Sequence, residues 1–184
     1  MIIAGAGSGK TRTLTYRIAH LIEEGVDPFN ILALTFTNKA AAEMKERIIK
    51  LVGNDARNIW MGTFHSIFAK ILRFEAEKLG YISSFTIYDT DDSKNAIKQI
   101  IKSLNLDHKT YNTSFVLGRI SMAKSNLISV NDYINNAEIQ QTDQASRKPM
   151  IGEIYKLYNQ RLRNSMAMDF DDLLFYTNIL LRDH

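Results

Sequence analysis

The sequence predicts an α/β protein built on a parallel β-sheet, with an all-helical subdomain inserted into it. Two observations carry this prediction. Short apolar runs alternate with helical periodicities up to about residue 90, and from Asp91 to about Asn164 the periodicity is purely helical. Regular alternation of strands and helices favours a parallel sheet with right-handed crossovers. We therefore expect a core formed by residues 1–90, an insertion formed by residues 91–164, and a return to the core at residues 165–184.

The core is expected to contain three strands, each followed by a helix that ends near a glycine. The apolar face of the first helix, which ends at Gly25, is marked by Leu14, Ile18, Leu21 and Ile22. The other expected elements are strands at 1–4, Ile31–Phe36 and Ile59–Thr63, and helices at Ala40–Val52, closed by Gly53, and at Ser66–Leu79, closed by Gly80.

The insertion is expected to consist of helices joined by polar segments. The apolar face of its first helix is formed by Ile97, Ile100, Ile101 and Leu104. Further helices are predicted at Phe115–Asn126 and at Pro149–Asn164, where proline suits the first helical position. The polar segment Asn135–Lys148 between them is predicted to be a mobile loop.

A last helix is predicted to open near Asp169 and to run through Leu173, Leu174 and Leu180. Asp169 and Asp172 have the spacing of a capping box. Two acidic groups could be interpreted as metal sites: Asp169, Asp171 and Asp172, and also Asp89, Asp91 and Asp92. Helix-start capping is the better interpretation of both, because acidic side chains favour that end of a helix.

The composition excludes several classes of function. With 45% hydrophobic and 23% charged residues, the chain is typical of soluble globular proteins. No apolar run approaches the ~20 residues that a membrane-spanning helix needs, and no targeting leader is apparent. The absence of cysteine excludes disulfides, thiolate metal sites and cysteine nucleophiles. We therefore expect a cytoplasmic protein with no membrane partner.

Positive charge is concentrated in one stretch of the chain. Residues 93–165 contain 11 Lys and Arg against 5 Asp and Glu, whereas the net charge of the whole chain is +3. Such a basic segment suits a partner with a phosphate backbone. A solvated helical surface is the alternative interpretation.

Residues 4–11, Ala-Gly-Ala-Gly-Ser-Gly-Lys-Thr, match the phosphate-binding P-loop pattern, with alanine in place of the first glycine. Small residues let phosphate oxygens approach backbone N–H groups, and the following helix directs the positive end of its dipole at the anion. Lys10 would reach the β- and γ-phosphates, Thr11 would bind Mg²⁺, and Arg12 could touch phosphate or base. The predicted ATP site comprises Ala4, Gly5, Ala6, Gly7, Ser8, Gly9, Lys10, Thr11 and Arg12.

Four segments occur in the order and at the spacing of a known family: residues 5–12, Leu34–Met44, Gly62–Ser66 and Met168–Leu174. Together they resemble the UvrD/Rep/PcrA group of superfamily 1 DNA helicases over nearly the whole chain. The resemblance implies a RecA-like P-loop NTPase core, the first motor subdomain, with a helical insertion. It also implies an enzyme that uses ATP and Mg²⁺ to move 3′→5′ along single-stranded DNA and to unwind single/double-strand junctions in repair or replication, with Lys10 and Thr11 as catalytic residues.

The resemblance further implies that the second and third motifs line a channel for single-stranded DNA. The residues concerned are Thr35, Phe36, Thr37, Asn38, Lys39, Thr63, Phe64 and His65. An aromatic ring at a strand end can stack on a base, and hydroxyl, amide and helix N-terminal N–H groups can hold phosphate. Binding should be sequence-tolerant and salt-sensitive. The alternative interpretations stay open. A phenylalanine at a strand end is commonly part of the core, a threonine or asparagine before a helix is commonly only a helix cap, and a lone histidine is commonly a structural residue.

The chain departs from the family pattern at both ends. The family has a glutamine-containing, adenine-recognising segment before the first strand and an Asp-Glu Walker B strand soon after the last helix, and the sequence contains neither. The second motor domain, which contributes arginines to the ATP site, is also missing. Hydrolysis needs Mg²⁺ held on both sides and an oriented water. We therefore expect that the 184-residue chain alone does not turn over ATP at a helicase's rate.

Three other functions fit parts of the sequence. The helicase part of a recombination nuclease of the RecB or AddA kind shares these motifs. A P-loop kinase acting on a small molecule would need a lid and an acceptor site, which are not recognisable, and would not explain residues 36–44. A plain nucleic-acid-binding module is the last alternative. Titration with labelled single strands, with and without ATP, distinguishes these functions. A kinase should not bind the DNA, and the DNA affinity of a plain binding module should not change with ATP.

Overall fold

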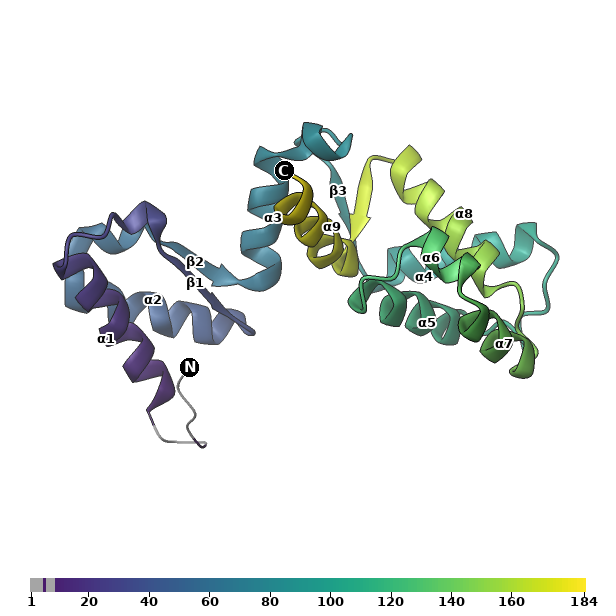
Figure 1. Cartoon of the computed structure of the whole chain (residues 1–184), viewed down its shortest axis with the longest axis horizontal. Helices are drawn as coiled ribbons and strands as arrows, with labels where there is room; N and C mark the ends of the chain where they lie inside the picture. The colour runs from purple at the N-terminus through teal and green to yellow at the C-terminus, as the bar shows by residue number, and fades with distance from the viewer. Residues whose placement is uncertain (1–4, 6–8) are drawn as a thin grey trace. The chain divides into compact units, whose positions relative to one another are not determined.

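The computed structural model describes Gly5 and residues 9–184 and divides into two compact units, Met1–Ile67 (unit 1) and Phe68–His184 (unit 2). Both are shown in Figure 1. The strand predicted at residues 1–4 and the P-loop positions Ala4, Ala6, Gly7 and Ser8 lie outside the described residues. Within the described part of the chain, no helix has the length and apolar character needed to span a membrane.

Unit 1 is a small α/β arrangement whose elements follow the sequence prediction. Strands β1 and β2 pair in parallel, with Leu32 opposite Trp60, and helix α2 packs against both strands and against α1 (Figure 1). The bounds are α1 Lys10–Glu23, a 3₁₀ turn at Pro28–Asn30, β1 Leu32–Thr35, α2 Asn38–Val52, a 3₁₀ turn at Gly53–Asn58 and β2 Trp60–Thr63. The core comprises Ile18, Ile31, Ala33, Met44, Ile48, Ala56 and Ile59.

Helix α3, Phe64–Phe74, begins directly after β2 and crosses the boundary between the units. The helix predicted at Ser66–Leu79 is thus shorter than expected. A 3₁₀ turn, Ala76–Leu79, replaces its last turn and ends at Gly80 in the left-handed conformation. The turn lets the N–H of Tyr81 bond to the carbonyl of Ala76, which is buried.

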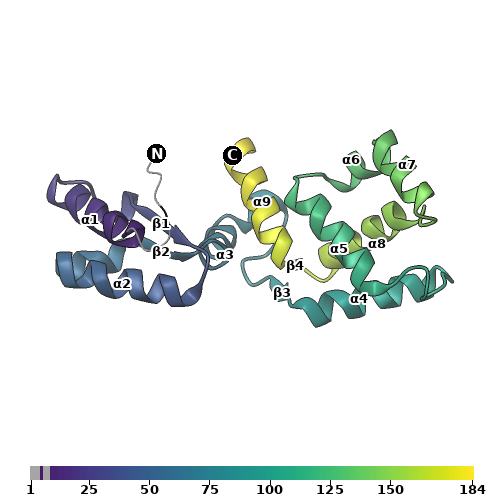
Figure 2. The same cartoon turned by 90° about the horizontal axis from the view of Figure 1, so that it is seen from below.

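Unit 2 is mainly helical and contains a second parallel strand pair. Strands β3 and β4 pair with Thr86 opposite Ala167, and helices α4, α5 and α8 lie side by side (Figure 2). The bounds are β3 Thr86–Tyr88, α4 Thr90–Ser103, α5 Thr113–Ser125, α6 Val130–Asn135, α7 Ala137–Ala145, α8 Ile151–Asn164, β4 Ala167–Asp169 and α9 Phe170–Asp183. The predicted apolar face of α4 is confirmed, because Ile97, Ile100 and Ile101 are buried.

Two predictions about unit 2 are wrong. The expected mobile loop at Asn135–Lys148 contains helix α7, whose start is capped by Asn136 through bonds from the N–H groups of Glu138 and Ile139. Helix α8 begins at Ile151, so Pro149 lies before the helix rather than at its first position. Within the described residues, the predicted parallel sheet is present as the pair β1 and β2, and β3 and β4 form a second, unpredicted two-stranded parallel sheet.

The capping interpretation of the acidic groups is confirmed. Asp89 and Asp92 form a capping box at the start of α4, and Asp169 and Asp172 form another at the start of α9. In the part of the chain that the structure describes, no group of three or more histidine or acidic residues could hold a metal ion.

Candidate functional site

The start of helix α1 has the backbone geometry that an anion site requires. Gly9 precedes the helix with φ 82° and ψ 17°, the left-handed region that favours glycine. The helix has no side-chain cap and no acidic residue in its first turn. Its positive dipole end is therefore not compensated by a carboxylate of this segment, which favours the approach of a phosphate.

Lys10, Thr11 and Arg12 occupy the exposed first turn of α1. The Nζ of Lys10 donates a hydrogen bond of 2.8 Å to the carbonyl oxygen of Gly5, so its ammonium lies beside the backbone of the glycine-rich segment. The guanidinium of Arg12 lies 5.6 Å from the ring centroid of Tyr16, one turn further along the helix. Three groups that can contact an anion or its metal ion thus share one helix turn.

A second set of candidate residues lies where β1 and β2 end. The parallel register places Thr35 opposite Thr63, so the residues that follow the two strands are neighbours. The rings of Phe36 and Phe64 are 5.4 Å apart between centroids and inclined at 51°. Phe36 is 89% exposed, which excludes the interpretation of this residue as core. We call this pair the aromatic ledge.

The hydroxyls beside the aromatic ledge are engaged in capping. Thr37 precedes α2, and its side chain accepts a bond of 3.1 Å from the N–H of Ala40. Thr63 is buried and donates to the hydroxyl of Ser66 at 3.0 Å. The remaining predicted DNA-binding residues lie around the ledge: Asn38 and Lys39 are exposed, and Thr35, Phe64 and His65 are half-buried.

Gly62 permits a close approach between the end of β2 and the first turn of α3. A Cβ atom at this position would lie 2.6 Å from the Oγ of Ser66 and 3.2 Å from Cγ1 of Ile67. Both distances are shorter than ordinary van der Waals contacts, so a side chain at this position would have to displace the Ser66 hydroxyl, which bonds to Thr63, and the Ile67 side chain. Gly62 therefore positions the segment that carries Phe64 and His65.

Comparison with known proteins agrees with this geometry. The sequence profile of the UvrD/REP helicase N-terminal domain matches residues 1–184. The chain belongs to this family. It is 47% identical over 178 residues to the ATP-dependent DNA helicase PcrA of Staphylococcus aureus and of Staphylococcus epidermidis. The match covers 96% of the chain but only 24% of each relative, so the chain spans about a quarter of their length.

This UvrD/Rep helicase domain contains a buried ionic cluster that the sequence did not reveal. The ammonium of Lys124, from α5, lies 2.7 Å from a carboxylate oxygen of Asp169 and 2.8 Å from one of Asp172. Asp169 also accepts a bond of 2.9 Å from the hydroxyl of Tyr158 in α8. Lys124, Asp169 and Asp172 are each less than 5% exposed. The cluster ties the start of α9 to the helices around it.

Electrostatics keep this cluster charged. Burial alone would lower the pKa of Lys124, but the carboxylates of Asp172 and Asp169 outweigh it and raise that pKa above its ordinary value. Burial raises the pKa of Asp172 to about 6, although Lys124 opposes the shift. Lys124 therefore remains an ammonium over the physiological pH range.

Several of the basic side chains that were predicted to face a phosphate partner instead contact groups of unit 2 itself. Besides Lys124, Arg119 forms an ion pair of 2.7 Å with the buried Asp143. Arg163 donates to the carbonyl of Leu79 at 2.6 Å and lies 4.5 Å from the ring centroid of Tyr81. No spacing along the chain signals these contacts, because their partners are distant in sequence.

Proposed function

We propose that the chain is the N-terminal, ATP- and single-stranded-DNA-binding part of an ATP-dependent 3′→5′ DNA helicase. Unit 1 would belong to a RecA-like P-loop core, with residues 91–164 as a helical insertion and residues 165–184 returning to the core. The observation that carries the proposal is the pairing, within unit 1, of an uncapped helix start bearing Lys10 with the aromatic ledge at the strand ends. The family membership supports the same function.

The start of α1 would bind the triphosphate of ATP. Backbone N–H groups at a helix N-terminus and the positive dipole end favour phosphate, and a lysine beside them adds a full positive charge. Lys10 would exchange its bond to the Gly5 carbonyl for bonds to phosphate oxygens. Thr11 is exposed, and its hydroxyl would hold Mg²⁺, which would neutralise phosphate charge there.

The aromatic ledge would bind unpaired bases of a DNA strand. A ring that is 89% exposed presents a face on which a base can stack, worth about 1–3 kcal/mol per base. Lys39 and the N-terminus of α2 lie directly after Phe36 and can contact the backbone phosphates. Stacking does not depend on the hydrogen-bonding groups at the edge of a base, so this surface would bind strands of differing sequence.

Nucleotide affinity of the Lys10→Ala variant tests the ATP site. Without the ammonium, affinity for a fluorescent ATP analogue should fall about 10-fold or more, since a charge-assisted bond contributes about 1.5–3 kcal/mol. Lys45→Ala, which removes an exposed lysine of α2, is the matched control and should bind as the wild type does. Equal affinity of the Lys10 variant and the wild type would overturn the nucleotide assignment.

Binding of a labelled single strand by the Phe36→Ala variant tests the ledge. Affinity should fall about 5- to 150-fold, the equivalent of one stacked base. Phe29→Ala is the matched control, because Phe29 is also a well-exposed phenylalanine of unit 1, at 61%. Affinity should decrease with rising salt in both proteins. If both variants lose affinity equally, the effect is not that of the ledge.

A further inference from the structure

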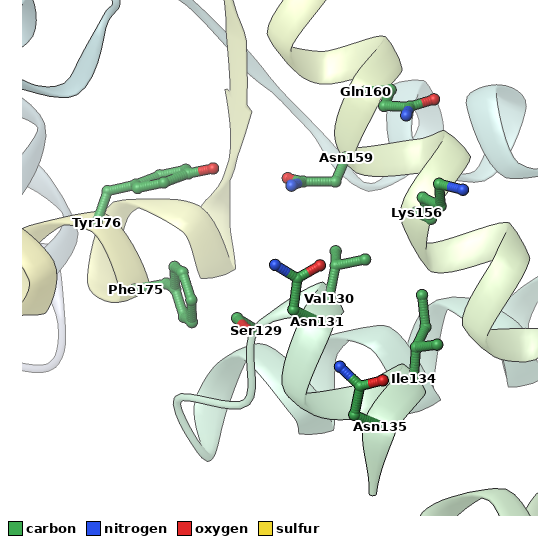
Figure 3. A pocket seen from close by; sticks show the side chains of 10 residues that line it. All are labelled: Ser129, Val130, Asn131, Ile134, Asn135, Lys156, Asn159, Gln160, Phe175 and Tyr176. Atoms are coloured by element: carbon green, nitrogen blue, oxygen red, sulfur yellow. The ribbon is translucent and has the colours of Figure 1, made fainter.

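Unit 2 contains an open cavity of about 530 Å³ that lies between helices α6, α8 and α9 (Figure 3). Its lining is rich in carboxamides, which are contributed by Asn131, Asn135, Asn159 and Gln160. Figure 3 shows that the side chains of Asn131 and Asn159 extend into the same space from different helices. The volume falls within the range of small-molecule sites, about 300–1,000 Å³.

The carboxamides have hydrogen-bonding capacity that the protein leaves unused. Each carries two N–H donors and one carbonyl acceptor. Across Gly5 and residues 9–184, none of the four side chains takes part in a hydrogen bond with another protein group. No carboxylate is present among the described residues that line the cavity. A ligand with adjacent donors and acceptors on one edge would satisfy several of these groups at once.

The wall opposite the carboxamides is aromatic. The rings of Phe175 and Tyr176 come from α9, with centroids 5.5 Å apart and planes at 86° to each other. Phe175 is half-buried and lines the cavity. On the far side, Lys156 places a cation at the rim, where its ion pair with Glu153 is long, at 3.8 Å, and solvent-exposed. Such a pair contributes little and yields readily to another anion.

We propose that this cavity binds a nucleobase, with Phe175 stacking on the base, Asn131 and Asn159 bonding to its edge, and Lys156 contacting the adjoining phosphate. Asparagine and glutamine are the side chains that pair with the edge of adenine through two hydrogen bonds. Aromatic rings and lysine supply the sequence-independent part of such sites. The residues that line this cavity all belong to unit 2, whereas the ATP and ledge residues all belong to unit 1.

An extended acidic peptide is the competing occupant, because carboxamides also bond to peptide backbones. The aromatic wall favours the base. A planar ring gains stacking energy from Phe175 while its edge reaches the carboxamides, whereas a peptide backbone offers no such face. The base could belong to a DNA strand or to a free nucleotide, and the chemistry is shared by both.

A titration that observes the side-chain amide resonances of asparagine and glutamine tests the site directly. The 184-residue chain is titrated separately with a single-stranded oligonucleotide, with deoxyadenosine monophosphate and with an acidic peptide. Resonances of Asn131 and Asn159 should shift with the oligonucleotide, and a shift with the mononucleotide as well would show that a single nucleotide suffices. The affinity measured at these resonances is independent of the ATP site and of the ledge.

Two variants and one control complete the experiment. Phe175→Leu and Asn131→Ala should each weaken the response at Asn159 about tenfold, whereas Asn178→Ala, an exposed asparagine of α9 outside the cavity, should not. Asn131 is exposed, so this variant should keep the fold even if Phe175→Leu does not. Absence of shifts with both nucleic-acid ligands, or shifts with the acidic peptide alone, would overturn the proposal.

Discussion

Replacing Lys124 by methionine should destabilise unit 2 strongly. The variant keeps the length of the side chain but removes an ammonium that lies within 2.8 Å of two carboxylates. Asp169 and Asp172 would then remain buried, at 4% and 1% exposure, without a cation. Removing one partner of a buried ion pair costs about 3–5 kcal/mol. For a chain of this size that lowers the melting temperature by about 6–20 °C.

Lys78→Met is the matched control. Lys78 pairs with Glu75 at 2.7 Å, the same distance as Lys124 and Asp169, but both side chains of that pair are nearly half exposed. An exposed pair contributes about 0–1 kcal/mol. Comparison of the two variants therefore contrasts a buried lysine that has two carboxylate partners with an exposed lysine that has one at the same distance.

The chain provides separate probes for its two units. Seven of the eight tyrosines lie in unit 2, whereas Trp60, the single tryptophan, lies in unit 1. Urea unfolding followed by near-ultraviolet circular dichroism of tyrosine reports unit 2, and tryptophan fluorescence reports unit 1. If Lys124→Met and Lys78→Met have equal urea midpoints at pH 8, measured by the circular dichroism of tyrosine, the cluster does not stabilise unit 2 as argued.

The pH dependence of Lys124→Met gives a second check with a defined sign. Burial already raises the pKa of Asp172 in the folded state, and without the ammonium that opposes this shift the pKa should rise further above its unfolded value. A raised carboxylate pKa favours the protonated folded state, so the destabilisation is largest above that pKa and shrinks as the pH falls. The difference from the wild type should therefore narrow between pH 8 and pH 5.

Three further predictions concern local structure. Gly62→Ala should destabilise unit 1 by about 1–3 kcal/mol, seen by tryptophan fluorescence, because its Cβ would lie 2.6 Å from the Oγ of Ser66. Asp143→Leu should cost about 3–5 kcal/mol and reduce helical circular dichroism, because it leaves a partly buried arginine without its carboxylate. Ser129→Ala should return the pKa of Asp132 from its lowered value toward 3.8, because Ser129 donates the hydrogen bonds that lower it. A carboxyl NMR titration measures this pKa. In the wild type, the stability that this carboxylate contributes is lost as the pH falls below 3.8.

Periodicity in the sequence predicted the elements that bury an apolar face. Helices α1, α2, α4, α5, α8 and α9 were all predicted, as were β1 and β2. The strands β3 and β4 were missed because each has three residues and its partner lies about 80 residues away. A strand of that length has no readable alternation, and its existence depends on tertiary pairing.

Helix α7 was missed for a different physical reason. Its sequence is polar, and a polar segment without periodicity is typical of a loop. The helix is held by Asp143, which is 1% exposed and accepts bonds of 2.7 Å from both Arg119 and the hydroxyl of Tyr133. Because a buried carboxylate depends on partners elsewhere in the chain, composition alone could not identify it.

The sequence predicted the start of α1 in more detail than the aromatic ledge. Glycine spacing placed the start of α1, because only glycine adopts the left-handed conformation of residue 9 without strain. The proximity of Phe36 and Phe64 required the register of β1 and β2, which pairs Thr35 with Thr63. Motif spacing indicated two strand ends, but not that the following rings would lie 5.4 Å apart.

The two units therefore hold their side chains in place by different means, and this difference has consequences for substitution. In unit 1, glycine conformation and strand register determine where Lys10 and Phe36 lie, so changes to those side chains should alter binding while the fold persists. In unit 2, buried ion pairs join helices that are distant in sequence, so changes to Lys124 or Asp143 should act through stability. A loss of DNA binding in a unit 2 variant is informative about the carboxamide cavity only when its unfolding midpoint is unchanged.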